Sequence, residues 1–243
     1  MNIKLAATLV TTIVIAVGFV LISPLYFHPA GFNGKQEIML SFSVTHPDNS
    51  VEWCKNLSSI LDQYNLSATV FIVGQVAEEN PQTVAVFGDK VDIGSLTYSN
   101  VNLTNIYDYS LKLQEVAKGK EAVDQAGNLD SKSFQAPAQA TDEDIYSLLS
   151  RSGILADFSY NSQYNVYQND QFIKFEATTV QAQSSQPETI LNRASTNQPL
   201  IIQFDDTCPS TYIAVYIESL VTGDFEFVNA SELTGLALTV RGI

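Results

Sequence analysis

Apolar residues recur along the chain in two alternating patterns, short continuous runs and longer stretches with helical spacing. The first run occupies residues 37–43, and the second, at 68–74, is rich in β-branched residues and ends at a glycine. Such runs are typical of strands that are covered on both faces. Between them, residues 50–64 place apolar side chains on one helical face, which predicts a strand–helix–strand unit with parallel strands.

The alternation continues to the end of the chain. Further strands are expected at residues 90–94, 133–137, 154–158, 172–175, 199–206 and 225–228, and further helices at 81–87, 106–126, between Thr141 and Gly153, at 188–193 and at 211–221. Asn49 with Glu52 and Thr141 with Asp144 have the spacing of helix N-caps, and Gly127 is expected to end a helix. Regular βα alternation over this length predicts an α/β barrel of about seven or eight units, whose strands end at a common rim where sites are built.

The N-terminus has a different pattern. An uncharged, apolar stretch begins at Leu5 and ends at Phe27, which is long enough to cross a membrane as a helix. No small-residue cleavage pattern follows it, so we expect an uncleaved anchor rather than a signal peptide. Lys4 precedes the stretch, which favours a cytoplasmic N-terminus and a domain outside the membrane. The expected organisation is an anchor at 1–27, a linker at 28–36 and one domain at 37–243.

Composition restricts the partners. The chain has 243 residues, 45% of them hydrophobic, so it can bury one substantial core. Its formal charge of −14 argues against nucleic acid, because phosphate backbones require clustered cations. The acidic residues are scattered, as on an ordinary solvated surface.

Two further features bear on location. Glycosylation sequons begin at Asn56, Asn65, Asn102 and Asn229, although a chain rich in Asn, Ser and Thr produces them by chance. The two cysteines, Cys54 and Cys208, are far apart in the sequence. They are either two buried thiols or, in oxidising surroundings, partners in a disulfide.

Several motifs at the predicted strand ends carry a family resemblance. They are LSFSVTHP at 40–47, LDQYNLSATVFIVG at 61–74, VDIGSLTYSN at 91–100, FQAP at 134–137 and FEFVNASEL at 225–233. In order and spacing they resemble the motifs of the polysaccharide deacetylase family, the NodB-type carbohydrate esterases, over residues 37–236. The resemblance implies a distorted (β/α)7-type barrel of the glycoside hydrolase/deacetylase kind, here preceded by one transmembrane helix.

The resemblance also implies a mechanism. In the family an Asp and two His bind a divalent metal, normally zinc, which polarises the amide carbonyl of an acetylated sugar and the attacking water. A second Asp is the general base and a late His is the acid.

This chain departs from the family at each of those positions. The base and the metal-binding Asp fall at Ser43 and Val44, the two metal-binding His at Leu96 and Asn100, the Arg that orients the base at Gln135, the Tyr after the proline at Ala138, and the late His at Phe204, beside Asp205. Because Val44 and Leu96 have no lone pair and an amide oxygen is a poor zinc ligand, we expect the inherited catalysis to be lost and no cofactor to be bound.

An alternative is a rebuilt site. His46 with Asp205 and Asp206 would lie at the same rim and could hold zinc or another divalent metal. The simpler interpretation, that these are ordinary loop and helix-cap residues, is favoured because no third ligand is evident. The implied topology also places Cys54 after the first strand and Cys208 after a neighbouring one, so a disulfide between them stays open beside two free thiols.

Three functions follow as hypotheses. The preferred one is a membrane-anchored, extracytoplasmic pseudoenzyme with a carbohydrate-binding or scaffolding role, in which rim tyrosines stack on sugar rings of a glycan or cell-envelope polymer. The tyrosines considered are Tyr98, Tyr107, Tyr160 and Tyr164. The second is an active N-acetyl hydrolase with the rebuilt site, and the third is an accessory subunit of a membrane-protein complex.

Overall fold

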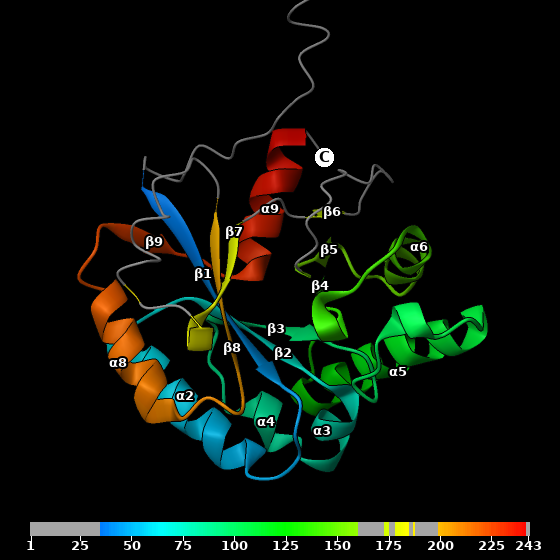
Figure 1. Ribbon diagram of the computed structural model, residues 1–243, viewed down its shortest axis with the longest axis horizontal. Coiled ribbons are helices and arrows are strands. Elements are labelled where there is room, and N and C mark those ends of the chain that lie inside the picture. Colours follow the sequence, from blue (N-terminus) through cyan, green and yellow to red (C-terminus); the bar gives the residue numbers. More distant parts are fainter. Residues whose placement is uncertain (1–34, 160–172, 175–177, 185–186, 188–198, 242–243) are drawn as a thin grey trace, which may run out of the picture.

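A curled parallel sheet forms the centre of the molecule (Figure 1). The computed structural model describes residues 35–159, 173–174, 178–184, 187 and 199–241. Within them the strand order is β6-β5-β4-β3-β2-β1-β8-β7, and β9 pairs with the beginning of β1. The strands are β1 Gln36–Val44, β2 Ala68–Ile72, β3 Val91–Ser95, β4 Ser133–Phe134, β5 Ala156–Asp157, β6 Ile173–Lys174, β7 Thr178–Gln181, β8 Leu200–Asp205 and β9 Phe225–Phe227. Among the described residues no pairing joins β6 to β7, so the sheet is an open half-barrel.

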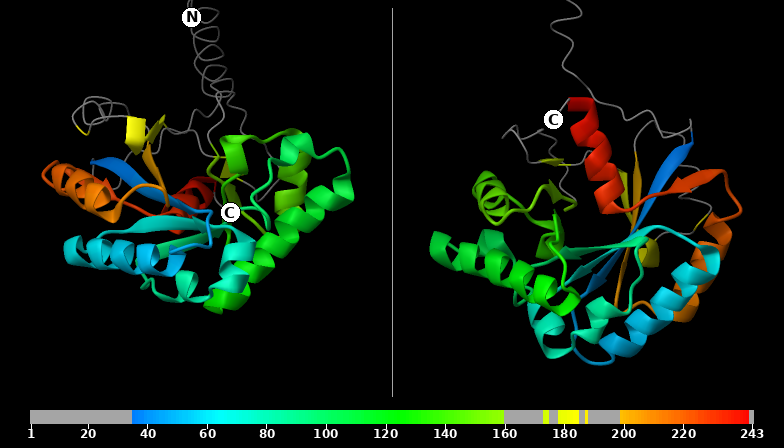
Figure 2. Two further views of the ribbon diagram at one scale, coloured as in Figure 1. Left: turned by 60° about the horizontal axis from the view of Figure 1, so that its bottom comes forward. Right: turned by 180° about the vertical axis from the view of Figure 1, so that it is seen from behind.

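Helices cover the sheet on two sides (Figure 2). The α-helices are α2 Ser50–Tyr64, α3 Gly74–Glu79, α4 Gln82–Ala85, α5 Tyr109–Gly127, α6 Glu143–Arg151, α8 Ser210–Leu220 and α9 Ala230–Arg241, and the 3-10 turns are η2 Leu103–Asn105, η3 Pro137–Gln139 and η4 Ala182–Ser184. Helices α2, α3, α4, α5 and α8 form an arc on the convex side of the sheet, and α9 lies on the concave side. This is the parallel α/β architecture that the βα alternation predicts.

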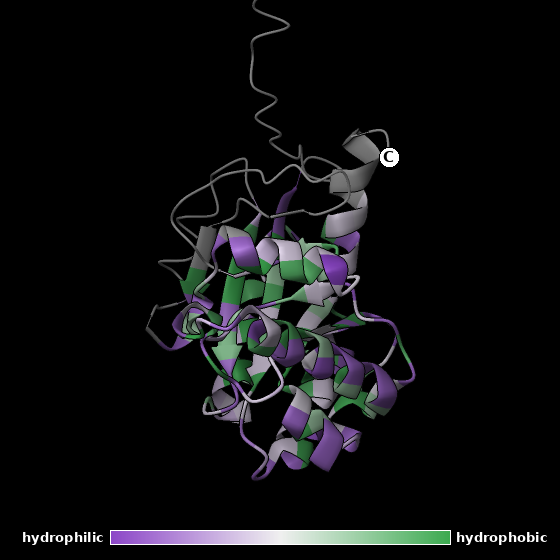
Figure 3. Cartoon of the chain, turned by 90° about the vertical axis from the view of Figure 1, so that its right-hand side faces the viewer, coloured by the Kyte–Doolittle hydropathy of each residue, from purple (hydrophilic) through white to green (hydrophobic). Residues whose placement is uncertain are grey.

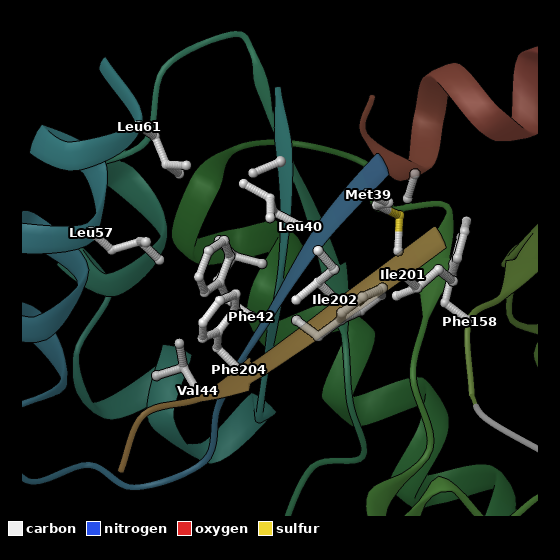
Figure 4. Packing of buried hydrophobic residues seen from close by; sticks show 14 of the residues in the cluster. Met39, Leu40, Phe42, Val44, Leu57, Leu61, Phe158, Ile201, Ile202 and Phe204 are labelled. Carbon is white, nitrogen blue, oxygen red and sulfur yellow. The ribbon is translucent and has the colours of Figure 1, made fainter. Parts of the chain in front are cut away.

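The main core lies between the sheet and the convex-side helices. Side chains of β1 alternate in direction, so Phe42 and Val44 point toward α2, whereas Met39 points to the opposite face with Ile201 (Figure 4). Phe42 stacks on Phe204 of β8 with ring centroids 5.1 Å apart. The colouring of Figure 3 shows the result, apolar strands in the interior and polar residues on the outer helix surfaces.

The concave face of β1 is polar toward its end. Ser41 is fully buried and Ser43 half-buried, and both lie on this face because they alternate with Phe42 and Val44. The row of polar residues continues on β8, because in the parallel pairing of β1 with β8 Ser41 lies beside Gln203 and Ser43 beside Asp205. The end of β1 is therefore apolar toward the helices and polar toward the concave side.

Most predicted elements are confirmed, with corrections at their ends. Helix α2 has the predicted bounds, whereas α5 begins at Tyr109, three residues later than predicted. Gly127 is the last residue of α5, and the left-handed residue that caps it is Asn128, with φ 49°. The helix predicted at 81–87 is only the short α4. The prediction missed α3, β7 and α9. The helix predicted at 188–193 lies outside the described residues.

The predicted capping pairs are wrong in detail. Asn49 occupies the N-cap of α2 with φ 60°, but its side chain makes no capping hydrogen bond. Asp142, not Thr141, caps α6 by accepting from the Ile145 amide. A reciprocal capping box opens α9 instead, because the Asn229 amide donates to Glu232 and the Glu232 amide to Asn229 Oδ1.

The predicted anchor, from Leu5 to Phe27, and most of the linker lie outside the described residues. In the part of the chain that the structure describes, no helix has the length and apolar character needed to span a bilayer. Strand β1 begins at Gln36, within one residue of the predicted start of the domain.

Candidate functional site

The loops that follow β1 and β8 are joined through Asp206. The two strands run in register to Ser43 and Asp205, and the Asp206 amide donates to the Ser43 carbonyl at 3.0 Å. The Asp206 carboxylate in turn accepts from the amides of Thr45 and His46, both at 2.8 Å, and from Thr45 Oγ1 at 3.1 Å. Its side chain is only 4% exposed. Asp206 therefore fixes the backbone of the loop after β1.

His46 shares this carboxylate. Its Nδ1 lies 2.9 Å from Asp206 Oδ1, while the imidazole is 62% exposed. The hydrogen bond from the ring to Asp206, and then the charge of that carboxylate, raise the pKa of His46 above 6.5, with smaller contributions from Asp205 and Asp48. The predicted meeting of His46 and Asp206 is thus present.

Asp205 makes a different contact. Its Oδ1 accepts from the Thr207 amide at 2.9 Å and from Thr207 Oγ1. It lies on the concave face with Ser43, but the structure gives it no bond to His46. Within the described residues there is no cluster of three or more His, Cys, Asp or Glu side chains that could hold a metal. His46, Asp205 and Asp206 therefore do not form a three-ligand group.

Ser43 and Gln135, the predicted positions of the base and its orienting Arg, are in contact. Ser43 Oγ donates to Gln135 Oε1 at 2.6 Å, and Gln135 Nε2 donates to Ser41 Oγ at 3.4 Å. Gln135 is 1% exposed. The spatial relationship implied for an Asp–Arg ion pair is kept here by two neutral side chains. The resemblance indicated the two positions separately, but no sequence pattern indicated the bond.

The positions assigned to the metal ligands are not together at the rim. Val44 and Leu96 are buried in the main core. Asn100 is exposed and has φ 59°. Phe204, at the position of the late His, lies between Phe42 and Tyr216 in the same core, its ring centroid 5.3 Å from that of Tyr216.

A strained turn follows Gln135. Ala138 and Gln139 both have positive φ, 55° and 57°. The resemblance places the family's Tyr at Ala138. Glycine adopts this conformation without strain, whereas Gln139 does so at a steric cost.

The rim tyrosines differ in their surroundings. Tyr98 donates its hydroxyl to Glu78 at 2.6 Å, and Lys118 Nζ lies 3.4 Å from its ring centroid. Tyr107 is fully exposed. Tyr160 and Tyr164 lie outside the described residues. Tyr98 is therefore occupied by protein contacts, and Tyr107 is open to a ligand.

The cysteines are near the same loops but are not bonded. Cys54 and Cys208 are both free and buried in the main core. Burial raises the pKa of Cys54 to about 12 and that of Cys208 to about 11. Trp53 Nε1 donates to the Cys208 carbonyl at 2.9 Å, which ties α2 to the start of α8 without a covalent bridge.

The sequons differ in accessibility. Asn56 and Asn65 are exposed. Asn102 is half-buried, and its Oδ1 accepts from the amide and hydroxyl of Thr104. Asn229 is buried, and its Nδ2 donates to the Lys90 carbonyl at 3.2 Å, so its amide already serves the fold.

A comparison with family models identifies the chain. The model described as polysaccharide deacetylase matches residues 32–156, just over half of the sequence. The chain belongs to the polysaccharide deacetylase family. A search of curated proteins found no match.

Solved structures of other deacetylase-family proteins share the fold. A Mycobacterium smegmatis protein named as a polysaccharide deacetylase aligns with TM-score 0.70 and 14% identity, over 86% of this chain and 92% of that one. The wild-type carbohydrate esterase family 4 (CE4) pseudoenzyme of Bacillus anthracis aligns with TM-score 0.62 and 17% identity, over 84% and 67%. The family 4 carbohydrate esterase of Streptomyces lividans, in complex with acetate, gives 0.60 and 18%, over 79% and 91%. At these identities the likeness shows the fold alone.

The residues at the positions of the family's metal ligands in this chain do not fit a divalent metal. Val44 and Leu96 offer no donor atom and are packed among aliphatic and aromatic side chains. Asn100 could supply one neutral oxygen, and neither Ser43 nor Gln135 carries a charge. We therefore derive no step through a metal at these positions.

Proposed function

We propose that the chain is a membrane-anchored, extracytoplasmic member of the polysaccharide deacetylase family that has lost the family's metal-dependent reaction and binds carbohydrate. The burial of Val44 and Leu96 in the core is the observation that carries the proposal. A single substitution at the rim could be compensated by a neighbouring donor. The loss of the two metal-ligand positions at Val44 and Leu96 cannot be compensated in this way, because a charged side chain placed in the core would lose its hydration.

The neutral pair of Ser43 and Gln135 supports loss of the base as well. The Ser43 hydroxyl donates its proton to a buried, uncharged amide, so it has no carboxylate with which to take a proton from water. The B. anthracis protein, which shares this fold, is named a CE4 family pseudoenzyme. It is a precedent for the loss of activity that we propose.

Carbohydrate is the ligand class that the fold and the rim chemistry favour. Ser43, which is half-buried at the concave end of β1, offers a neutral hydroxyl that can bond a sugar hydroxyl without charge. Tyr107, fully exposed in the loop before α5, adds a ring on which a sugar face can stack. A scaffolding role on a cell-envelope polymer would use the same surfaces.

The anchor rests on the stretch from Leu5 to Phe27, which is uncharged and of spanning length. The partners proposed are therefore the membrane, through this stretch, and a glycan. An accessory role in a membrane-protein complex would instead give a stable partner that co-purifies in mild detergent.

The proposal is tested with the full chain in mild detergent. We expect retention on an insoluble N-acetylated polysaccharide, weakened by Tyr107→Ala, and no acetate release from N-acetylated oligosaccharides. Leu111→Ala, a change to another exposed residue, is the matched control and should leave retention unchanged. Acetate release that requires added zinc, or no retention by the wild type, would contradict the proposal.

A second candidate is a hydrolase with a rebuilt metal site at His46, Asp205 and Asp206. The contact between His46 and Asp206 favours it, but Asp205 is directed to Thr207. Zinc-dependent acetate release that disappears in both His46→Ala and Asp205→Asn would establish it.

A further inference from the structure

We propose that a groove between α5 and the turn from α3 to α4 is a docking site for a basic segment of a partner protein. The groove has a volume of about 350 Å³ and lies on the convex side of the sheet, where α3 and α4 both pack on α5 (Figure 1). None of its lining residues is at a position assigned to a metal, a sugar or the base. The inference therefore goes beyond the proposed function and does not depend on it.

Two close contacts between helices leave the groove open between them. Gly74 of α3 lies so close to Gly119 of α5 that a Cβ on Gly74 would be 2.7 Å from the Gly119 Cα. Gly127, the last residue of α5, lies against Val84 of α4, where a Cβ would be 2.6 Å from Val84 Cγ1. Between these contacts the chain turns at Pro81, and the space between this turn and α5 is the groove. Its shape is therefore set by the packing of the helices before any ligand binds.

Small apolar residues form the floor of the groove. Ala77 is fully buried, and Ala122 and Ala126 are half-buried on the facing side of α5. Pro81 adds its ring from the turn. Because methyl groups do not fill the groove, the aliphatic stem of a long side chain can lie on them and lose its contact with water. The floor therefore suits the stem of a lysine or an arginine.

Glu121 gives the groove a carboxylate that needs a cation. It is exposed, and its Oε1 accepts from Gln125 Nε2 at 3.1 Å. Glu78, the other carboxylate, already accepts from the Tyr98 hydroxyl at 2.6 Å and lies 3.9 Å from Lys118 Nζ. In the part of the chain that the structure describes, no cation pairs with Glu121. A basic side chain that enters along the floor would supply this missing partner.

The lysine of the groove cannot serve Glu121 itself. Lys118 Nζ lies 3.4 Å from the centroid of the Tyr98 ring, which holds the ammonium by a cation–π contact. The chain as a whole has a formal charge of −14, which attracts basic partners and repels acidic ones. Charge complementarity therefore favours a basic occupant, both at the groove and at long range.

Leu111 extends the contact surface along α5. It is 50% exposed, although it is a large apolar residue. It precedes Lys118 by seven residues and Ala122 by eleven, spacings that return to the same face of an α-helix. Eleven helical residues span about 16 Å. A ligand that covers both Leu111 and the groove is therefore a chain segment that carries an apolar residue beside its cation.

The test uses the full chain in mild detergent with 13C-labelled alanine methyl groups. The probe is the acetylated and amidated peptide LARAL, which is about 16 Å long when extended. We expect saturable chemical-shift changes at the methyl groups of Ala77, Ala122 and Ala126. The methyl group of Ala214, half-buried on α8, should not shift.

Three variants locate the binding. Glu121→Gln should weaken it roughly two- to fivefold, as expected for an exposed ion pair. Ala122→Leu, which fills the groove, should weaken it about tenfold or more. Glu52→Gln removes an exposed carboxylate from α2 and is the matched control, which should bind as the wild type does. Equal melting temperatures would confirm that the variants are folded, and if Ala122→Leu unfolds, Glu121→Gln still decides the question.

Leu111→Ala separates this surface from the carbohydrate site. It should weaken peptide binding about threefold through lost apolar contact, and leave retention on polysaccharide unchanged.

Four results would overturn the inference. They are no shift at the three groove alanines, equal shifts at Ala214, equal binding by Glu121→Gln and wild type, and equal shifts from spermidine, which would make the groove a site for free polyamines. Shifts that appear on raising the protein concentration without peptide would assign the groove to a second copy of the chain, and would also overturn it.

Discussion

Ser43 Oγ and Gln135 Oε1 lie 2.6 Å apart, although β1 and the end of β4 are separated in the sheet by β2 and β3. In a flat sheet, three strand spacings of about 4.8 Å would place these residues about 14 Å apart. The contact therefore requires the sheet to curl, so that side chains on its concave face meet across intervening strands. It also places a neutral hydrogen bond where the family resemblance implies an ion pair.

The contact between Ser43 and Gln135 predicts that substitutions which introduce charges at these two positions have strongly coupled effects on the free energy of unfolding. Gln135→Arg should destabilise the protein by about 3–5 kcal/mol, because it buries a cation with no partner. Adding Ser43→Asp should recover much of that loss by restoring the pair. Urea unfolding of both single variants and the double variant measures the coupling. Additive effects would show that the two side chains do not interact as described.

His46 predicts a pH dependence of stability with a defined sign. Its pKa is raised in the fold, so the stabilisation is fully present below its unfolded value of 6.5 and is lost as pH rises through the folded pKa. His46→Gln should remove this slope. The effect should be small because the imidazole is largely exposed. Unfolding curves across this pH window test it, and a slope that persists in the variant would point to another group.

The buried carboxyl group of Asp92 predicts a second pH dependence of the stability. Burial is the largest influence on its pKa and raises it above 3.8, against hydrogen bonds from Ser231 and Ser133. The contribution of Asp92 to the stability of the fold is therefore fully present below pH 3.8 and is lost as the pH rises through the pKa of the folded state.

Asp92→Asn should therefore be at least as stable as wild type at neutral pH, since an amide can still bond both hydroxyls. Its advantage should shrink as the pH falls. Chemical denaturation at neutral and acidic pH measures the difference. A variant that is clearly less stable at neutral pH would show that the charge of Asp92 is needed.

Gln139 predicts a stabilising substitution. Its φ of 57° is in the region that glycine adopts without strain, so Gln139→Gly should be neutral or stabilise the fold by up to about 1 kcal/mol. Thermal unfolding against Gln139→Ala, which keeps the Cβ, isolates the backbone effect. A glycine variant less stable than the alanine variant would contradict the described conformation.

The sequence predicted the strands better than the contacts. Continuous apolar runs located β1, β2 and β8, because strands covered on both faces have no polar alternation to confuse them. It missed α9, although Asn229 and Glu232 have capping-box spacing. Four-residue β7 is too short to give a clear pattern.

At the site, the sequence predicted that His46 and Asp206 lie at the same rim, because parallel strands end together, and the structure places the two side chains in contact. It could not predict that Asp205 bonds Thr207, since that choice depends on a local turn. Nor could it predict the contact of Ser43 with Gln135, because the curl of the sheet, rather than any local spacing, brings them together.

The metal content of the full chain tests the central claim most directly. Elemental analysis after incubation with zinc and removal of the excess should find no stoichiometric metal, because Val44 and Leu96 are core residues without donor atoms. Stoichiometric zinc that survives this treatment would contradict the loss of the family's reaction. Its disappearance in His46→Ala or Asp206→Asn would then locate a rebuilt site at the rim.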